Sequence, residues 1–304
     1  MKNSLLLFCL FVLILAASCS SSKRLTSENL IQKRPPGTVL FEGNLLLDET
    51  ELTNLSWGEY LWWLSSNYSK ESPKYLNALP DTTVWQNPEI CYYVYSELYF
   101  RHPAYSDYPV VGLSQKQIRE FCKWRSDRVM ELILVRDERI IYQHKREIED
   151  LFTIEKYYTD SLDYVIEDEK LEYYPEYRLP TLAERERILQ KQDSIARSDY
   201  KQTRKDWKPW EEYYLSQIRA DVPCCSSSIQ LSIPTKNVFF GSYLGEFDNL
   251  RGNVSEFVEE DSISVGGSWY DSKIRIFECD TFHVSKPNAW TGFRNVCEWK
   301  KWTP

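Results

Sequence analysis

The C-terminal part of the chain contains three short strings rich in glycine and aromatic residues: NLRGNVSEF at 249–257, GGSW at 266–269 and GFR at 292–294. Around them, after Pro223, apolar runs are short and are interrupted by Gly, Ser, Asn and Pro. This composition predicts irregular loops and short hairpins rather than long helices. The paired glycines of GGSW favour a close approach between two stretches of backbone. The arginine of GFR is expected to fix the last strand to the core.

Three further strings precede these in the chain: LDETELTN at 47–54, PVVGLS at 109–114 leading into FCKW, and YRLPTLAERE at 177–186. Singly each is weak, but the six in this order resemble the formylglycine-generating enzyme, or sulfatase-modifying factor, family over about residues 39–297. The resemblance implies a compact α+β fold akin to C-type lectins, poor in regular secondary structure and held together by loops.

Three capping boxes predict where helices begin, because each pairs an N-cap Ser or Thr with a Glu or Gln three residues later. Apolar residues at helical spacing follow each box. The boxes pair Ser56 with Glu59, Ser114 with Gln117, and Thr181 with Glu184.

Short strands are predicted at 39–41 and 44–48, and an aromatic, β-branched strand at 91–100. Within the predicted domain of residues 39–304, acidic and basic residues alternate over about 131–177. We expect this stretch to be an inserted, mostly helical excursion with solvated faces.

The resemblance also implies a chemistry: the family's enzymes oxidise a cysteine of a client peptide to formylglycine with oxygen and a copper ion held by two thiolates. Sulfur is the soft ligand that Cu(I) requires. The two aligned positions here are Asp271 and Ile276, and only Ser268 of that group is retained. Cys279 is three residues out of register. We therefore expect no copper and no oxidase activity; the alternative is oxidase activity of the family's type or an altered chemistry that uses Ser268, Asp271 and His283.

A structural calcium site is the second implication of the resemblance. The family pattern Asn-x-x-Gly-Asn-x-x-Glu matches residues 249–256. On that match the side chains of Asn249 and Glu256 and the carbonyls of Gly252 and Val254 would bind Ca²⁺, which prefers oxygen ligands. The alternative is a metal-free turn in which Asn and Glu bond amides.

Cysteines outside the N-terminal segment number six of the eight in the chain. In an exported protein they suggest disulfides, and six cysteines allow fifteen pairings. The resemblance favours Cys122–Cys297. The adjacent Cys224 and Cys225 cannot easily bridge to each other without strain.

The N-terminal segment resembles a bacterial lipoprotein signal. An apolar run from Leu5 to Ala17, too short to span a bilayer, is followed by Ser18 and Cys19. We expect residues 1–18 to be the signal peptide, Cys19 to carry the lipid, and 19–38 to be a Ser-, Lys- and Pro-rich tether. An ordinary signal peptide with an incidental cysteine is the alternative.

Composition limits the partners of this chain of 304 residues. The formal charge is −8 and no dense basic run occurs, so a nucleic-acid partner is not expected. The 11 Trp and 21 Tyr residues suit a surface that binds a glycan, a peptide or another envelope protein.

Together these features predict a lipid-anchored, non-catalytic binding or scaffold protein in the envelope, at the outer membrane of a Gram-negative bacterium. Domains of this family without the catalytic cysteines, the resemblance implies, occur in gliding and protein-secretion lipoproteins of the Bacteroidetes group.

Overall fold

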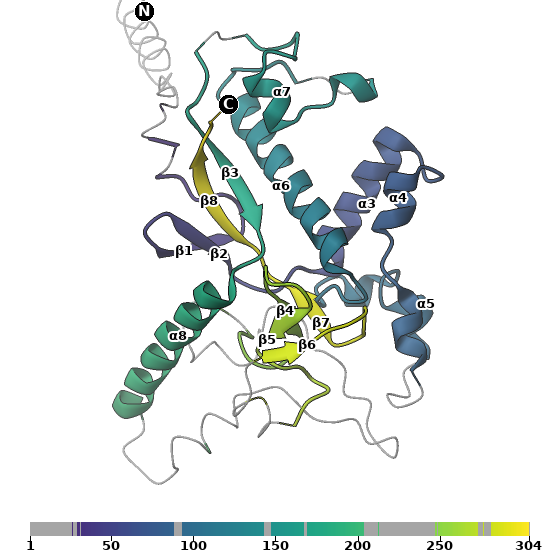
Figure 1. Ribbon diagram of the computed structural model, residues 1–304, viewed down its shortest axis with the longest axis vertical. Coiled ribbons are helices and arrows are strands. Elements are labelled where there is room, and N and C mark those ends of the chain that lie inside the picture. The colour runs from purple at the N-terminus through teal and green to yellow at the C-terminus, as the bar shows by residue number, and fades with distance from the viewer. Residues whose placement is uncertain are drawn as a thin grey trace, which may run out of the picture.

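The structure is a computed structural model, and it describes residues 26, 29–30, 32–87, 93–142, 147–166, 169–203, 212, 247, 249–272, 276 and 281–303. Two four-stranded sheets and several helices form an α+β arrangement, as expected (Figure 1).

The first sheet joins the two ends of the domain. Its strand order is β1-β2-β8-β3, and every neighbouring pair is antiparallel. The central pairing sets Leu46 opposite Cys297, which in turn lies opposite Tyr177. The first two strands confirm the short strands predicted at 39–41 and 44–48, and they form a hairpin around Gly43, whose φ of 58° suits glycine. The bounds are β1 Thr38–Glu42, β2 Leu45–Asp48, β3 Tyr173–Arg178 and β8 Val296–Lys301.

The second sheet holds the glycine-rich strings. Its order is β6-β5-β4-β7, with β4 and β7 parallel and the other pairs antiparallel. NLRGNVSEF ends in β4, GGSW begins directly after β5, and GFR begins in β7, so the sheet brings all three strings together. The strands are β4 Ser255–Phe257, β5 Ile263–Val265, β6 Thr281–His283 and β7 Thr291–Phe293.

Two of the three predicted capping boxes are confirmed. Ser114 and Gln117 bond each other's backbone at the start of α6, and Thr181 and Glu184 do so before α8. The first helix, α3, begins earlier than predicted, at Asn54, because Thr53 is its N-cap and accepts from the Ser56 amide. The α-helices are α3 Asn54–Tyr68, α4 Pro73–Ala78, α5 Tyr95–Leu98, α6 Gln115–Arg136, α7 Ile154–Tyr158 and α8 Leu182–Thr203. Short 3-10 turns lie at Thr82–Gln86, Pro103–Tyr105 and Ile148–Asp150.

The aromatic strand predicted at 91–100 is wrong for its described part, residues 93–100, which contains the helix α5. Tertiary packing overrides the β propensity of these aromatic residues. Tyr99 lies against Trp85, with ring centroids 4.6 Å apart, and its hydroxyl donates to the Pro109 carbonyl at 2.6 Å. One helical turn places Tyr95 and Tyr99 on the same side, facing that indole.

The main core lies where α3, α6 and the second sheet meet. The Trp57 ring stacks on Phe121 with centroids 5.1 Å apart, and Phe121 meets Phe293 at 5.6 Å. The Trp57 indole N–H donates to the Ala78 carbonyl, so this large ring is buried without leaving a donor unpaired. Figure 1 shows α6 running beside β3 and β8.

The insert is more buried and less helical than predicted. Over its described residues, α6 continues to Arg136, and α7 and a 3-10 turn are the helical segments that follow before β3. Phe152, Tyr157 and Leu171 are buried in the main core. Asp127 of α6 accepts a hydrogen bond from the Ile154 amide at 2.8 Å.

The predicted tether also contacts the core. Leu30 is fully buried, and the Lys33 carbonyl accepts from the Trp299 indole at 3.1 Å. The packed part of the molecule therefore extends N-terminal of the domain boundary expected at residue 39. Cys19 and the predicted signal peptide lie outside the described residues. In the described part of the chain, no helix is both long and apolar enough to cross a membrane.

Candidate functional site

The region aligned with the family's copper site is filled by the chain itself. Ser268 donates from its amide and its hydroxyl to one oxygen of Asp271, at 3.0 Å and 2.7 Å. Ile276 is fully buried against Gly267. A Cβ added to Gly267 would lie 2.5 Å from the Ile276 side chain. A carboxylate and a hydrocarbon cannot act as the two thiolates that Cu(I) needs. The residues at these positions therefore do not fit a copper ion.

The residues considered for an altered chemistry are only partly brought together. Ser268 and Asp271 form a buried pair, in which the hydroxyl is already committed as a donor to the carboxylate. His283 is exposed on β6, where it pairs with Ile263. Cys279, the nearest cysteine in sequence, lies outside the described residues.

The predicted Cys122–Cys297 disulfide is wrong: both cysteines are free thiols, and both are buried. Cys122 lies on α6 and accepts a hydrogen bond from the Asn295 side chain at 3.0 Å. Cys297 lies on the central strand β8, between Leu46 and Tyr177. Burial raises the pKa of Cys122 to about 12 and also raises that of Cys297, so both thiols stay protonated near neutral pH. The other cysteines predicted to form disulfides lie outside the described residues.

The loop of residues 249–256 turns sharply through left-handed backbone. Asn249, Gly252 and Asn253 have φ values of 54°, 81° and 58°. The Gly252 amide donates to the Gly266 carbonyl, and the Asn253 carbonyl accepts from the Trp269 amide. A Cβ on Gly266 would lie 2.6 Å from the Leu250 carbonyl oxygen, which confirms that the paired glycines allow a close backbone approach.

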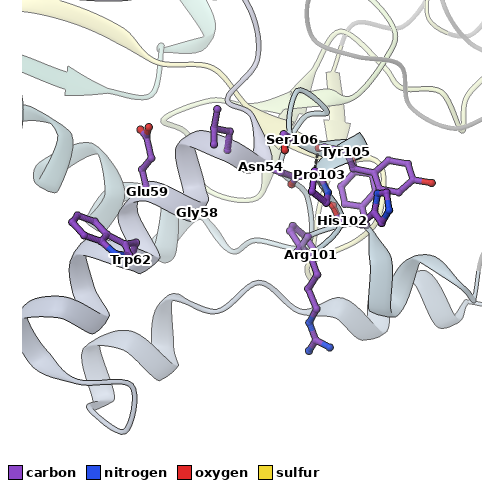
Figure 2. A pocket seen from close by; sticks show the side chains of 12 residues that line it. Asn54, Gly58, Glu59, Trp62, Arg101, His102, Pro103, Tyr105 and Ser106 are labelled. Atoms are coloured by element: carbon purple, nitrogen blue, oxygen red, sulfur yellow. Dashed lines mark hydrogen bonds between the residues drawn. The ribbon is translucent and has the colours of Figure 1, made fainter.

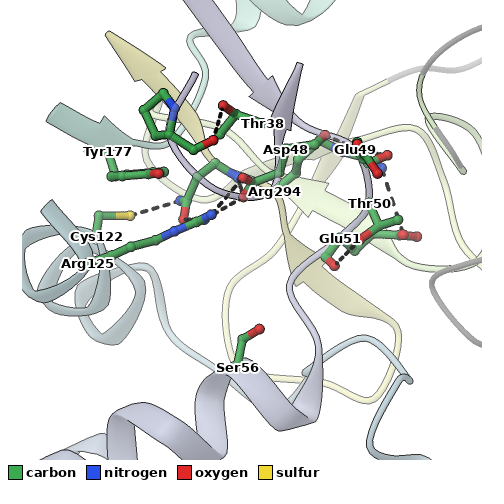
Figure 3. A network of polar contacts seen from close by, with 12 residues as sticks. Thr38, Asp48, Glu49, Thr50, Glu51, Ser56, Cys122, Arg125, Tyr177 and Arg294 are labelled. Atoms are coloured by element: carbon green, nitrogen blue, oxygen red, sulfur yellow. Dashed lines mark hydrogen bonds and ion pairs between the residues drawn. The ribbon is translucent and has the colours of Figure 1, made fainter. Parts of the chain in front are cut away.

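A buried row of charged side chains lies behind this loop. Arg294 binds one oxygen of Glu256 through Nε at 2.9 Å and Nη2 at 2.8 Å, and Arg185 Nε lies 3.4 Å from the other oxygen. The same Arg294 donates to the carbonyls of Asp48 and Glu49 and lies 3.8 Å from Glu51. Figure 3 shows Arg294 reaching the segment that carries Glu49 and Glu51.

These contacts confirm that Arg294 fixes the last strands to the core. Burial alone would lower the pKa of Arg294, but Glu256 and Glu51 raise it, so the guanidinium remains charged. Burial raises the pKa of Glu51 to about 8, against the lowering effect of Arg294. Asn253 donates to Glu51 at 2.8 Å.

A second polar cluster, also visible in Figure 3, links α6 to both ends of the chain. Arg125 binds the two oxygens of Asp48 at 2.6 Å and 2.9 Å, donates to the Asn295 side chain, and stacks 4.1 Å from the ring centre of Tyr177. Such a two-pronged pair fixes orientation as well as distance.

The predicted calcium ligands do not fit a cation site in this arrangement. Glu256 faces guanidinium groups with both oxygens. The Asn249 amide nitrogen lies 3.4 Å from Glu51, a hydrogen-bond donor turned toward a carboxylate. In a metal-free turn, Glu256 would bind guanidinium groups rather than amides.

Sequence reasoning missed Arg185 and Glu51 as members of this cluster. Arg185 lies one helical turn before Ile188, on the face of α8 that also buries Leu189 and Ala196. A charged residue at an apolar position of a helix indicates a buried partner, so this signal was present. Nothing local marked Glu51, whose partners are about 200 residues away in sequence.

A separate pocket of about 350 Å³ lies between α3 and the segment that follows α5. Figure 2 shows Glu59 and Trp62 projecting from α3 on one side, with Arg101, His102 and Tyr105 on the other. The Trp62 side chain is 70% exposed. Asn54, 9% exposed, donates to two backbone carbonyls, and its buried Oδ1 has no hydrogen-bond partner among the described residues.

Comparisons with known proteins give remote structural similarities. The crystal structure of CarF is similar at a TM-score of 0.39 and 16% identity, covering 84% of this chain and 86% of that one. The structure of PvdO from Pseudomonas aeruginosa is similar at a TM-score of 0.32 and 14% identity, covering 64% and 63%. No curated protein matches. The model of the sulfatase-modifying factor enzyme 1-like domain matches residues 11–299, nearly the whole chain, and this chain therefore belongs to the sulfatase-modifying factor family.

Proposed function

We propose that this protein is a lipid-anchored component of the cell envelope whose sulfatase-modifying factor domain binds a partner instead of oxidising a substrate. Cys19 would hold it at the outer membrane of a Gram-negative bacterium, as in the gliding and protein-secretion lipoproteins that the family resemblance suggests.

One observation supports the non-catalytic part of this proposal: the side chains at the positions aligned with the family's copper ligands are engaged within the fold. Ile276 is buried against Gly267, and Asp271 is bonded to Ser268. Of the two thiols in the described part of the chain, neither could replace these ligands, because Cys122 and Cys297 are buried in the first sheet and its helix. Neither Asp271 nor Ile276 supplies the thiolate that the family's oxidation chemistry needs at these two positions.

The pocket beside α3 supports a binding role, and a protein is the partner that it fits best. Leu55 and Trp62 are exposed by 53% and 70%, and they are two helical turns apart on the same helix. Exposed apolar and aromatic side chains beside a pocket are typical of protein interfaces, in which tryptophan often contributes most of the binding energy.

The catalytic question is tested with the reduced protein, Cu(I), oxygen and a cysteine-containing peptide. We expect neither oxygen consumption nor an aldehyde on the peptide. Aldehyde formation at a rate above that of free copper would contradict the proposal.

The binding role is tested by detergent extraction of tagged, full-length protein from envelopes after chemical cross-linking. We expect one partner protein in stoichiometric amount with the wild type and much less with Trp62→Ala at equal protein recovery. Glu97→Ala, which changes an exposed residue outside the pocket, is the matched control. Recovery of a bound glycan and no protein would overturn the choice of partner.

A further inference from the structure

The loop of residues 249–256 is held by the positively charged side chains of Arg185 and Arg294 rather than by a metal ion. Glu256, which the family pattern makes a metal ligand, is about 1% exposed and lies between Arg294 and Arg185, themselves 0% and 1% exposed. Its first oxygen is within 2.9 Å of two Arg294 nitrogens, and its second is 3.4 Å from Arg185 Nε. Both oxygens therefore already face a positive charge.

Arg185 also reaches the backbone of the loop. Its Nη2 donates to the carbonyl of Leu250, inside the family's metal-binding pattern. Gly266 makes room for this contact, since a Cβ there would lie 3.1 Å from the same nitrogen. One guanidinium thus contacts a side-chain oxygen and a backbone oxygen of the loop, which are the two kinds of ligand a calcium ion would collect.

We propose that Arg185 takes the place of the calcium ion in this chain and, with Arg294, makes the loop independent of divalent cations. A guanidinium offers five donors in a fixed plane and remains charged when buried beside a carboxylate. It is anchored covalently in the first turn of α8, so it binds the loop without a dissociable ligand. A Ca²⁺ ion near Glu256 would be repelled by two guanidinium groups in direct contact with that carboxylate.

The remaining side-chain ligand of the pattern is engaged in a way that agrees with this proposal. The Asn249 nitrogen points toward Glu51, 3.4 Å away, and Asn253 donates to the same carboxylate. Arg294 lies 3.8 Å from Glu51, so the row of buried ionisable side chains continues from Arg185 through Glu256 and Arg294 to Glu51. The loop is therefore tied to α8, to β7 and to the segment after β2.

The test compares thermal unfolding of the full-length protein in Ca²⁺ and in EGTA, for the wild type and for two arginine variants. We expect the wild-type midpoint to be the same in both solutions. Arg185→Met should lower the midpoint by on the order of 5–10 °C in both, because it leaves part of a buried carboxylate without its partner. Arg187→Met is the matched control: it lies two residues away on α8, has a side chain 50% exposed, and should change the midpoint little.

Two results would overturn the proposal. One is a wild-type midpoint that rises in Ca²⁺, with the rise lost in Asn249→Ala. The other is an Arg185→Met protein as stable as the wild type. If Arg185→Met does not fold, Arg185→Lys replaces it: this variant keeps the charge without the planar guanidinium and should lower the unfolding midpoint by less. The comparison of the wild type in Ca²⁺ and in EGTA needs no variant.

Discussion

At the scale of single residues, buried and partly buried arginines connect parts of this chain that are distant in sequence. Arg178 binds both Glu184, at 2.8 Å, and Glu298. These bonds lower the pKa of Glu184 even though burial alone would raise it. Arg125 pairs with Asp48 at 2.6 Å, and Arg294 lies 3.8 Å from Glu51, in the segment at the end of β2. Removing one partner of such a pair is costly because the other charge stays buried.

The two described thiols give the first prediction. Because Cys122 and Cys297 are buried and protonated, they should resist iodoacetamide at pH 8 in the folded protein and react fully in denaturant. Peptide mapping by mass spectrometry measures labelling at each cysteine. A Cys122–Cys297 linked peptide in a digest without reductant would show that the oxidised form exists.

At the scale of elements, the sequence predicts the N-cap of a helix correctly where the local pattern offers a single capping residue. The boxes of α6 and α8 were predicted correctly. For α3 two candidates, Thr53 and Ser56, are three residues apart, and the local pattern favoured the wrong one. Thr53 is the N-cap because the residue before it is held in place. The Leu52 amide donates to the Phe293 carbonyl, and the Leu52 carbonyl accepts from the Val110 amide.

The identity of this cap can be tested by alanine substitution. Thr53→Ala should lower the free energy of unfolding by about 1 kcal/mol, since it removes the acceptor for the Ser56 amide. Ser56→Ala should change it by less than about 0.5 kcal/mol. Urea denaturation followed by circular dichroism gives both values. Equal losses in the two variants would contradict the assignment of the cap.

The two tryptophans of α3 separate stability from binding. Trp57→Ala should lower the free energy of unfolding by about 3–5 kcal/mol, because a fully packed ring and its hydrogen bond are lost. Trp62→Ala should change it by less than about 0.5 kcal/mol, since most of that side chain is in water. Denaturant titrations measure both; a large loss in Trp62→Ala would mean that this residue supports the fold rather than a partner.

At the scale of the whole molecule, the first sheet is completed only when the C-terminal strand arrives. β2 pairs with β8 across about 250 residues of sequence, and β8 also pairs with β3. The Arg294 side chain donates to the Asp48 carbonyl, and the Asn295 amide donates to the Asp48 side chain. The C-terminal region and the N-terminal hairpin therefore stabilise each other. Truncating β8 would therefore be expected to unfold the hairpin as well.

Membrane attachment is also a property of the whole chain. Cys19→Ser should move the protein from the membrane fraction to the soluble fraction, because the proposed lipid would be lost. Cys9→Ser, a change of the same kind within the apolar run, should leave the protein in the membrane fraction. Fractionation and immunoblotting measure the distribution, and unchanged membrane recovery of Cys19→Ser would contradict lipidation.

The sequence alone determined the family, the α+β class, the first two strands and two helix starts. These features depend on residue identity and on neighbours within a few positions. Tertiary structure alone decided that 93–100 contains a helix, that the insert packs on the core, that Cys122 and Cys297 are free, and that Glu256 lies between two arginines. Each of these outcomes depends on which distant side chain fills a buried position, and local sequence spacing does not encode that contact.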